Sequence, residues 1–187
     1  MGERWTLLLV RNLLLGPKRY GQLLEGLPDI TTNLLAKRLR EMSQLGLIEK
    51  RQDEYALTEL GASLEPVIME LGRWGGRFLG APEPSDRLDM GWGLLSMKRR
   101  YRGGLKLVAE LRIDERVFEL AFSRSYLSVQ ERAASLPEVT LRGESAAFRA
   151  LLWAGIPYER LAAKGQLVAT GEIQKLLNAF TPLPRTT

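Results

Sequence analysis

Apolar residues recur at helical spacing through the first 80 residues of the chain. Residues 5–15 predict a helix that ends at a Gly-Pro pair, and residues 20–25 predict a short second helix. Asp29 or Thr31 is expected to cap a third helix, which runs to about residue 44, by accepting a backbone N–H of its first turn. Four apolar residues share one side of that helix and are predicted to face a core: Ile30, Leu35, Leu39 and Met42.

Two short strands and a long helix are expected next. Gly46 closes the third helix, residues 47–48 predict the start of a strand, and residues 55–57 predict a second short strand after a polar stretch. Thr58 is expected to open a helix that reaches about residue 79. The apolar stripe of this helix consists of Leu60, Leu64, Val67, Ile68, Leu71, Trp74 and Phe78.

The pattern changes near residue 80, where a short Pro-rich polar stretch indicates a domain boundary. Alternation with period two predicts adjacent strands joined at Asp114-Glu115, and the second half is therefore predicted to be an α+β domain with an antiparallel sheet. The predicted strands cover residues 105–113, 118–122, 126–131, 139–141 and 166–170, and the predicted helices cover residues 90–101, 143–154, 158–163 and 172–180. We expect domains at residues 1–80 and 90–187, with a linker at residues 81–89.

The order of elements in the first half is that of a winged helix-turn-helix, mainly α with a small β-hairpin wing. The third helix carries small polar and basic residues on the side that its core residues leave free, and such a helix fits the ~12 Å major groove of B-DNA. A short basic hairpin beside it can reach phosphates or the minor groove. The residues predicted to contact double-stranded DNA are Thr31, Thr32, Asn33, Lys37, Arg38 and Arg40, with Lys18, Arg19 and Arg51 as phosphate contacts.

The first half also resembles a known family over residues 2–79. The matching motifs are Gly2-Glu3-Arg4-Trp5, Gly16-Pro17-Lys18-Arg19-Tyr20, Leu27-Pro28-Asp29-Ile30-Thr31, Leu35 to Leu39-Arg40-Glu41-Met42, Gly46-Leu47-Ile48 and Tyr55-Ala56-Leu57-Thr58-Glu59-Leu60-Gly61. Together they resemble the HxlR-type bacterial transcription regulators. The resemblance implies a dimeric DNA-binding repressor or activator.

Residues 90–182 resemble the sterol carrier protein domain. The motifs are Val139-Thr140-Leu141-Arg142-Gly143, Leu151-Leu152-Trp153-Ala154-Gly155 and the stretch from Lys164 to Gly171 before a terminal helix. The resemblance implies a shell of sheet and helices around an apolar cavity for a lipid-like ligand; the alternative is an ordinary filled core. The residues that would line the pocket are Trp92, Leu95, Phe118, Leu120, Phe122, Phe148, Leu152, Trp153 and Phe180.

Two further surfaces are predicted from the pattern. The stripe on the helix after Thr58 is too long for one small domain to cover easily, so we expect a homodimer interface there, with an intramolecular core as the alternative. Its residues are Leu64, Ile68, Leu71, Trp74 and Phe78. The basic cluster Lys98-Arg99-Arg100 with Arg102 is either a solvated helix end or a contact for DNA or an anionic ligand.

Composition narrows the chemistry. The 187 residues contain no Cys and no His, which excludes thiolate nucleophiles, disulfides, Cys metal sites and Ser–His–Asp catalysis within this sequence. No carboxylate pair points to catalysis, so we expect no enzyme activity, no cofactor and no metal. The net charge is +5, but bases and acids nearly cancel in the first 80 residues. No apolar run approaches the ~20 residues that a bilayer span needs, so a cytoplasmic protein without a membrane partner is expected.

Two hypotheses of different kinds follow. In the first, the N-terminal domain binds operator DNA as a dimer, and the C-terminal domain binds an apolar effector that biases the spacing of the two recognition helices. In the second, the C-terminal domain is a filled module without a ligand that dimerises the regulator or recruits another protein. An enzyme acting on a bound acyl substrate is the third and weakest hypothesis.

Overall fold

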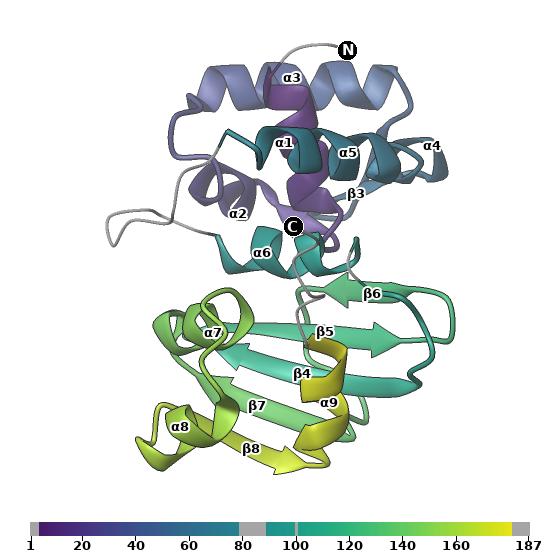
Figure 1. Cartoon of the computed structure of the whole chain (residues 1–187). Helices are drawn as coiled ribbons and strands as arrows, with labels where there is room; N and C mark the ends of the chain where they lie inside the picture. Colours follow the sequence, from purple (N-terminus) through teal and green to yellow (C-terminus); the bar gives the residue numbers. More distant parts are fainter. Residues whose placement is uncertain (1–3, 79–88, 100, 181–187) are drawn as a thin grey trace. The chain divides into compact units, whose positions relative to one another are not determined.

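The computed structural model describes residues 4–78, 89–99 and 101–180, and the side chain of Phe180 is outside that description. The chain forms two compact units, Met1–Arg87 and Leu88–Thr187 (Figure 1). Of the predicted linker at residues 81–89, only Asp89 belongs to the described part. Among the described residues, no helix combines the length and the hydropathy needed to cross a bilayer.

Three helices build the core of the first unit. They are α1 (Arg4–Leu13), α2 (Tyr20–Glu25) and α3 (Thr32–Gln44). Thr31 is the N-cap of α3, and its side-chain oxygen accepts a hydrogen bond from Leu34 N at 3.4 Å. The four residues predicted to face the core from this region, Ile30, Leu35, Leu39 and Met42, are all buried. The helix predictions for the region before residue 45 are thus confirmed.

A small sheet lies beside these helices. It has the order β1-β3-β2, with β1 (Lys18–Arg19), β2 (Ile48–Arg51) and β3 (Glu54–Leu57). Strands β2 and β3 form the predicted hairpin wing, and Gln52 in its two-residue turn has a φ of +52°. The two-residue strand β1, which pairs Lys18 with Tyr55, was not predicted because so short a strand has no alternation to read.

The single long helix predicted after Thr58 is wrong. The structure has two helices, α4 (Glu59–Ala62) and α5 (Glu65–Gly75), separated at Ser63 and Leu64. Pro66 explains the break, because its ring clashes with the carbonyl of the residue four positions earlier in a continuous helix, and that residue is Ala62, the last of α4. In its actual place, in the first turn of α5, Pro66 needs no N–H.

The second unit is built on a five-stranded sheet of order β6-β5-β4-β7-β8 (Figure 1). Its strands are β4 (Leu107–Ile113), β5 (Arg116–Phe122), β6 (Leu127–Gln130), β7 (Val139–Gly143) and β8 (Leu167–Gly171). The predicted β4–β5 hairpin is confirmed, with Ile113 opposite Arg116. The predicted antiparallel sheet is wrong in one respect: β7 runs parallel to β4, with Ala109 beside Val139, so the sheet is mixed.

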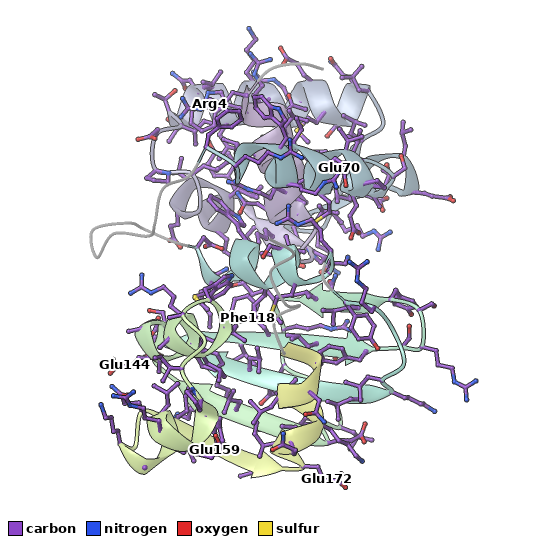
Figure 2. The ribbon with its side chains drawn as sticks, in the orientation of Figure 1. Arg4, Glu70, Phe118, Glu144, Glu159 and Glu172 are labelled. Atoms are coloured by element: carbon purple, nitrogen blue, oxygen red, sulfur yellow. The ribbon has the colours of Figure 1, made fainter. Side chains whose placement is uncertain are left out.

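Helices cover the apolar face of this sheet. They are α6 (Met90–Met97), α7 (Ser145–Leu152), α8 (Tyr158–Ala163) and α9 (Ile173–Phe180), and α9 contacts β7 and β4. Phe118, labelled in Figure 2, is fully buried in this layer, as is Phe148. Trp153 packs on α6 so closely that a Cβ at Gly93 would lie 2.6 Å from its ring.

The opposite face of the sheet is polar and crossed by chain. The connection between β6 and β7 passes over it, because β6 lies at one edge and β7 beside β4. Glu110, buried at 3% exposure, accepts hydrogen bonds from Arg112 Nε at 2.7 Å and from Ala134 N of that connection at 3.0 Å. Glu138 ties the end of the connection to β4 by accepting from Val108 N at 3.1 Å.

Candidate nucleic-acid interface

Helix α3 divides its residues between a core and a free face. Leu35, Leu39 and Met42 are buried, whereas Thr32, Asn33, Lys37 and Arg40 are exposed. These four side chains carry donors and acceptors that match base edges and phosphates, and the helix is long enough to follow a groove. The structure thus brings the predicted base-contacting residues onto one exposed surface.

Contacts at the start of α3 fix its direction relative to α2. The hydroxyl of Tyr20, the first residue of α2, donates to Thr32 O at 2.7 Å. The N–H of Arg19, the N-cap of α2, donates to Gln22 Oε1 at 2.8 Å. The first bond joins the two helices of the helix-turn-helix and the second caps α2, so the exposed face of α3 is presented by a preorganised support.

Two of the residues predicted to contact DNA are much less exposed than the others. Lys18 is buried at 8% exposure, because strand β1 pairs with β3 and carries its side chain inward. The side chain of Arg38 is 13% exposed and forms an ion pair with Glu41 one turn later. Both cations are therefore less accessible to a phosphate than the side chains on the exposed face of α3.

The remaining basic residues are exposed. Lys37 Nζ lies 3.9 Å from Glu41 Oε1, and Arg19 Nε lies 3.9 Å from Glu54 Oε1. Arg51 pairs with Glu49. Exposed pairs of this kind contribute only ~0–1 kcal/mol, so a phosphate can compete for the same cations at small cost.

Sequence reasoning missed one residue of this surface. Lys50 is exposed on β2 next to Arg51, and its Nζ lies 5.9 Å from the centroid of the Tyr55 ring. Lys50 lies opposite Tyr55 across the hairpin. The alternation of residues along the two strands could have predicted this pair from the sequence. With Arg51, Lys50 makes the wing a second basic element beside α3.

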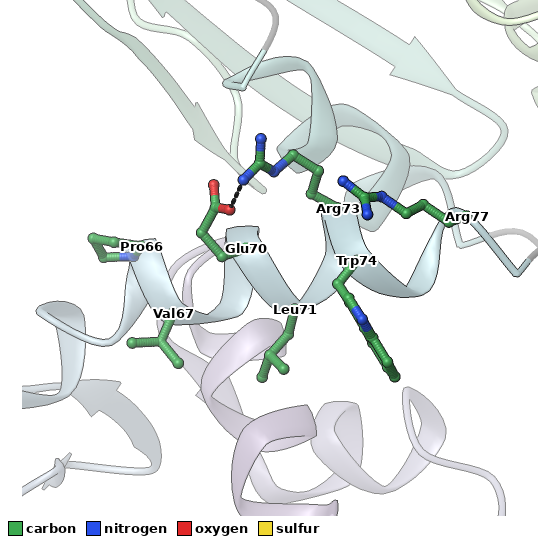
Figure 3. A pocket seen from close by; sticks show the side chains of 7 residues that line it. All are labelled: Pro66, Val67, Glu70, Leu71, Arg73, Trp74 and Arg77. Atoms are coloured by element: carbon green, nitrogen blue, oxygen red, sulfur yellow. Dashed lines mark hydrogen bonds and ion pairs between the residues drawn. The ribbon is translucent and has the colours of Figure 1, made fainter.

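Helix α5 presents an apolar row to the outside. Val67, Leu71 and Trp74 lie on one side of the helix, and Glu70 and Arg73 pair with each other on another side (Figure 3). They border a surface hollow of about 570 Å³, and Trp74 and Phe78, 61% and 71% exposed, contact each other edge to face at 4.9 Å. Of the residues predicted for a dimer interface, Ile68 is buried in the unit's own core, and Val67 takes its place in the exposed row.

The residues predicted to line a ligand pocket lie in the apolar layer of the second unit. Leu95, Phe118, Leu120, Phe122, Phe148 and Leu152 are all buried. Trp92 and Trp153 are half-buried, and the side chain of Phe180 lies outside the described residues. In the described part of the chain, no three acidic side chains come together as they would around a metal ion.

Comparison with known proteins identifies the first unit. Residues 1–83 match the family model described as HxlR-like helix-turn-helix. The chain is 38% identical over 85 residues to the HTH-type transcriptional regulator YkvN of Bacillus subtilis. The aligned region covers 42% of this chain and 72% of YkvN. The chain is 34% identical over 93 residues to the HTH-type transcriptional regulator YodB of the same organism, covering 46% of this chain and 80% of YodB.

Among solved structures, the quinone-bound YodB of B. subtilis matches with 38% identity and a TM-score of 0.39, over 41% of this chain and 88% of that one. The extent of the match to YkvN and YodB places the winged helix-turn-helix described above within one family of DNA-binding, non-enzymatic regulators. The chain belongs to the HxlR family of helix-turn-helix transcription regulators.

Proposed function

We propose that α3 is the recognition helix of this regulator and that Thr32, Asn33, Lys37 and Arg40 read base edges in the major groove. The observation that carries this proposal is the division of α3 into a buried side and an exposed polar and basic side. Asn suits a bidentate bond to adenine, and Lys and Arg suit guanine or phosphate. Thr31 at the start of the helix, Arg19 beside α2 and Arg51 on the wing contact phosphates and fix the register.

Selection of duplexes from a random library by the full-length protein tests this proposal. We expect a short preferred sequence to emerge, and we expect Lys37→Ala/Arg40→Ala to lower the ratio of affinities between that duplex and a scrambled one. Failure of the wild-type chain to bind any duplex at low salt, or an unchanged ratio in the double variant, would contradict the proposal.

We further propose that the regulator is a homodimer and that Val67, Leu71, Trp74 and Phe78 of the α5 region form its interface. An exposed row of large apolar side chains of this kind is typical of a surface that another chain covers. Helix-turn-helix readers bind two half-sites about one turn of DNA apart, which a two-fold dimer supplies.

For the second unit, the packing favours a filled module that dimerises the regulator or recruits another protein. Six of the nine predicted pocket residues are buried in one apolar layer, and Trp153 leaves no room for a Cβ at Gly93. An apolar effector is the alternative, and the observation in its favour is that Trp92 and Trp153 stay half-buried at the edge of that layer.

Native mass spectrometry of the purified full-length chain separates these alternatives. The filled module predicts the mass of the polypeptide or of its dimer, with no added ligand mass. A copurifying apolar molecule, whose addition also changes affinity for the selected duplex, would establish the effector instead. Because these 187 residues contain no cysteine, the response to an effector cannot proceed through a thiol of this sequence.

A further inference from the structure

Two connections of the second unit meet at one end of its sheet. Strand β4 begins opposite the end of β5, with Leu107 beside Phe122, and Phe122 also pairs with Leu127 at the start of β6. The α6–β4 connection and the β5–β6 turn therefore lie side by side (Figure 1). A hydrogen bond from Gly104 N to Arg124 O, at 3.0 Å, joins them directly.

The backbone at this place is held in position by further contacts. The Tyr101 hydroxyl donates to Ser123 O at 2.7 Å and accepts from Leu105 N at 2.9 Å, and its ring packs edge to face on Phe122. Gly103 has a φ of +85°, and a Cβ there would lie 2.2 Å from Arg124 O. The two connections approach so closely that only glycine fits at that position.

Three cations project from this fixed support. Arg102 and Lys106 on the first connection and Arg124 on the second are exposed, and their side chains form no ion pair with the described carboxylates. We call these three residues the basic corner. The sequence holds no Asp or Glu in residues 98–106 or 123–130.

The carboxylates on and beside the neighbouring strands form ion pairs with arginines outside the basic corner. Glu110 binds Arg112, Glu119 binds Arg132 at 2.7 Å, and Glu131 binds Arg116 at 2.6 Å. Each of these bonds is formed within the sheet and its crossing connection. The positive charge of the basic corner is therefore not neutralised by the described part of the second unit.

We propose that the basic corner binds DNA phosphates, so that the second unit adds a sequence-independent contact to the duplex that α3 reads. This inference rests on the proposed function of α3. Arg and Lys side chains on a preorganised support donate hydrogen bonds to phosphodiester oxygens. The hydroxyl of Tyr126, a residue that is 63% exposed, lies in the same turn and is a further donor. Tyr126 is the one large apolar side chain among the described residues of the two connections that is mostly exposed, which favours a phosphate backbone over a lipid surface.

The salt dependence of DNA binding by the full-length protein tests the proposal. The probe is a 40-base-pair duplex selected from a random library, with a scrambled duplex beside it, and affinity is measured by fluorescence anisotropy from about 50 to 300 mM KCl. For Arg102→Gln/Lys106→Gln/Arg124→Gln, the slope of log affinity against log salt should fall by roughly 2–3 units, because each phosphate contact contributes about 0.9. The ratio between the two duplexes should stay constant, because phosphates carry no sequence information.

A second triple variant, Arg142→Gln/Arg160→Gln/Lys164→Gln, removes the same charge from exposed positions elsewhere in the second unit. It should keep a slope close to that of the wild type. Equal slopes for the wild type and the basic-corner variant, or equal losses in both triple variants, would overturn the proposal. If the triple variant does not fold, the three single substitutions provide the test, and each should lower the slope by about 1 unit.

Failure of this inference differs from failure of the function proposed for α3. If Lys37→Ala/Arg40→Ala lowers the ratio between selected and scrambled duplexes while the basic-corner variant keeps the wild-type slope, only the present proposal fails. Loss of binding to phosphatidylglycerol vesicles by the basic-corner variant, with DNA binding unchanged, would assign the surface to a membrane and also overturn the proposal.

Discussion

Asn33 and Gln44 carry the same amide group at opposite ends of α3, and both are exposed. Only Asn33 lies in the first turn, from which recognition helices contact base edges. We expect Asn33→Ala to weaken binding to the selected duplex by about 1–3 kcal/mol, or roughly 5–150-fold, and to relax the preference at one base pair. Fluorescence anisotropy with single-base variants of the duplex measures both effects.

Gln44→Ala is the matched control, and it should leave affinity and preference unchanged. Asn33 is exposed, so its removal should not alter the thermal unfolding of the protein. An Asn33→Ala variant with the wild-type base preference would show that Asn33 does not contact a base.

Gly61 shows how a single position can limit the packing of α4. A Cβ at Gly61 would lie 1.9 Å from Leu47 O, and Leu47 O already accepts a hydrogen bond from Thr58 N. Since the clash is with backbone, Gly61→Ala should lower the free energy of unfolding by about 1–3 kcal/mol or more. Urea denaturation followed by circular dichroism provides the measurement.

Gly21 in α2 is the contrasting position, because a Cβ there meets no described atom within 4 Å. Gly21→Ala should raise the free energy of unfolding by roughly 0.5–1 kcal/mol through the helix propensity of alanine. If Gly61→Ala is as stable as the wild type or more stable, the close approach of α4 to Leu47 is refuted.

At the level of elements, helices with caps and stops were predictable and interruptions were not. Helix α2 was expected at residues 20–25 and has those bounds, and Thr31 was one of two candidates for the cap of α3. The break between α4 and α5 was missed although Pro66 signals it, because the apolar stripe continues at helical spacing across the gap. The same stripe placed Ile68 at the surface, whereas the structure buries it.

The basic residues of the site illustrate the same limit. Periodicity separated the core side of α3 from Thr32, Asn33, Lys37 and Arg40. It gave no information on Lys18, whose burial depends on the pairing of β1 with β3, where its partner Tyr55 lies 37 residues away in sequence. Long-range pairing of this kind leaves no local pattern.

Helix α5 offers a prediction about assembly. Leu71→Glu/Trp74→Glu places two charges in the exposed apolar row and should convert the proposed dimer to a monomer, because burial of unpaired carboxylates at an interface is unfavourable. Analytical ultracentrifugation over a range of concentrations measures the change. Both side chains are exposed, Leu71 at 45% and Trp74 at 61%, so the variant should fold.

Leu45→Glu, at the exposed C-cap of α3, provides the same change of chemistry outside the row and should stay dimeric. A wild-type chain that sediments as a monomer, or a double variant that remains a dimer, would remove α5 from the interface.

Arg116 joins three elements of the second unit. Its guanidinium binds Glu131 beyond β6 and, at 2.7 Å, Asp89, which caps α6. Burial lowers the pKa of Arg116, but the hydrogen bonds and charges of Glu131 and Asp89 outweigh this and raise the pKa above the usual value for arginine. A raised pKa means that the stabilisation is present at lower pH and is lost only as the pH rises through that value, so Arg116 is no switch near neutrality.

Arg116→Gln should lower the free energy of unfolding by about 1–2 kcal/mol, a modest loss because the side chain is 36% exposed and partly screened. Thermal denaturation at neutral pH measures it. Arg160→Gln, at an exposed position on α8, should have no measurable effect. Similar losses in both variants would show that total charge, and not this connection, determines the change.

For the whole molecule, the sequence predicted two halves of different character, and the chain has two compact units, each with its own buried apolar residues. Every strand of the second unit was anticipated, but the direction of β7 was not. Alternation identifies which residues share a face of the sheet. It does not show that β7 pairs with β4, because this pairing depends on the path of the β6–β7 connection.

Two cores predict two unfolding transitions. In differential scanning calorimetry, Gly61→Ala should lower one transition temperature and Arg116→Gln the other, because each variant disturbs the packing of one unit. A single transition that both variants shift equally would indicate one cooperative unit instead.

The parallel pairing of β4 with β7 has a consequence for the order in which the second unit acquires its structure. The β4–β5 hairpin joins residues that are adjacent in sequence, so it can form early. Val108 and Glu138 meet only when a loop of 30 residues has closed. During synthesis on a ribosome, the hairpin must therefore wait with one edge uncovered until β7 emerges, and this interval is when the nascent chain is most exposed to chaperones and to self-association.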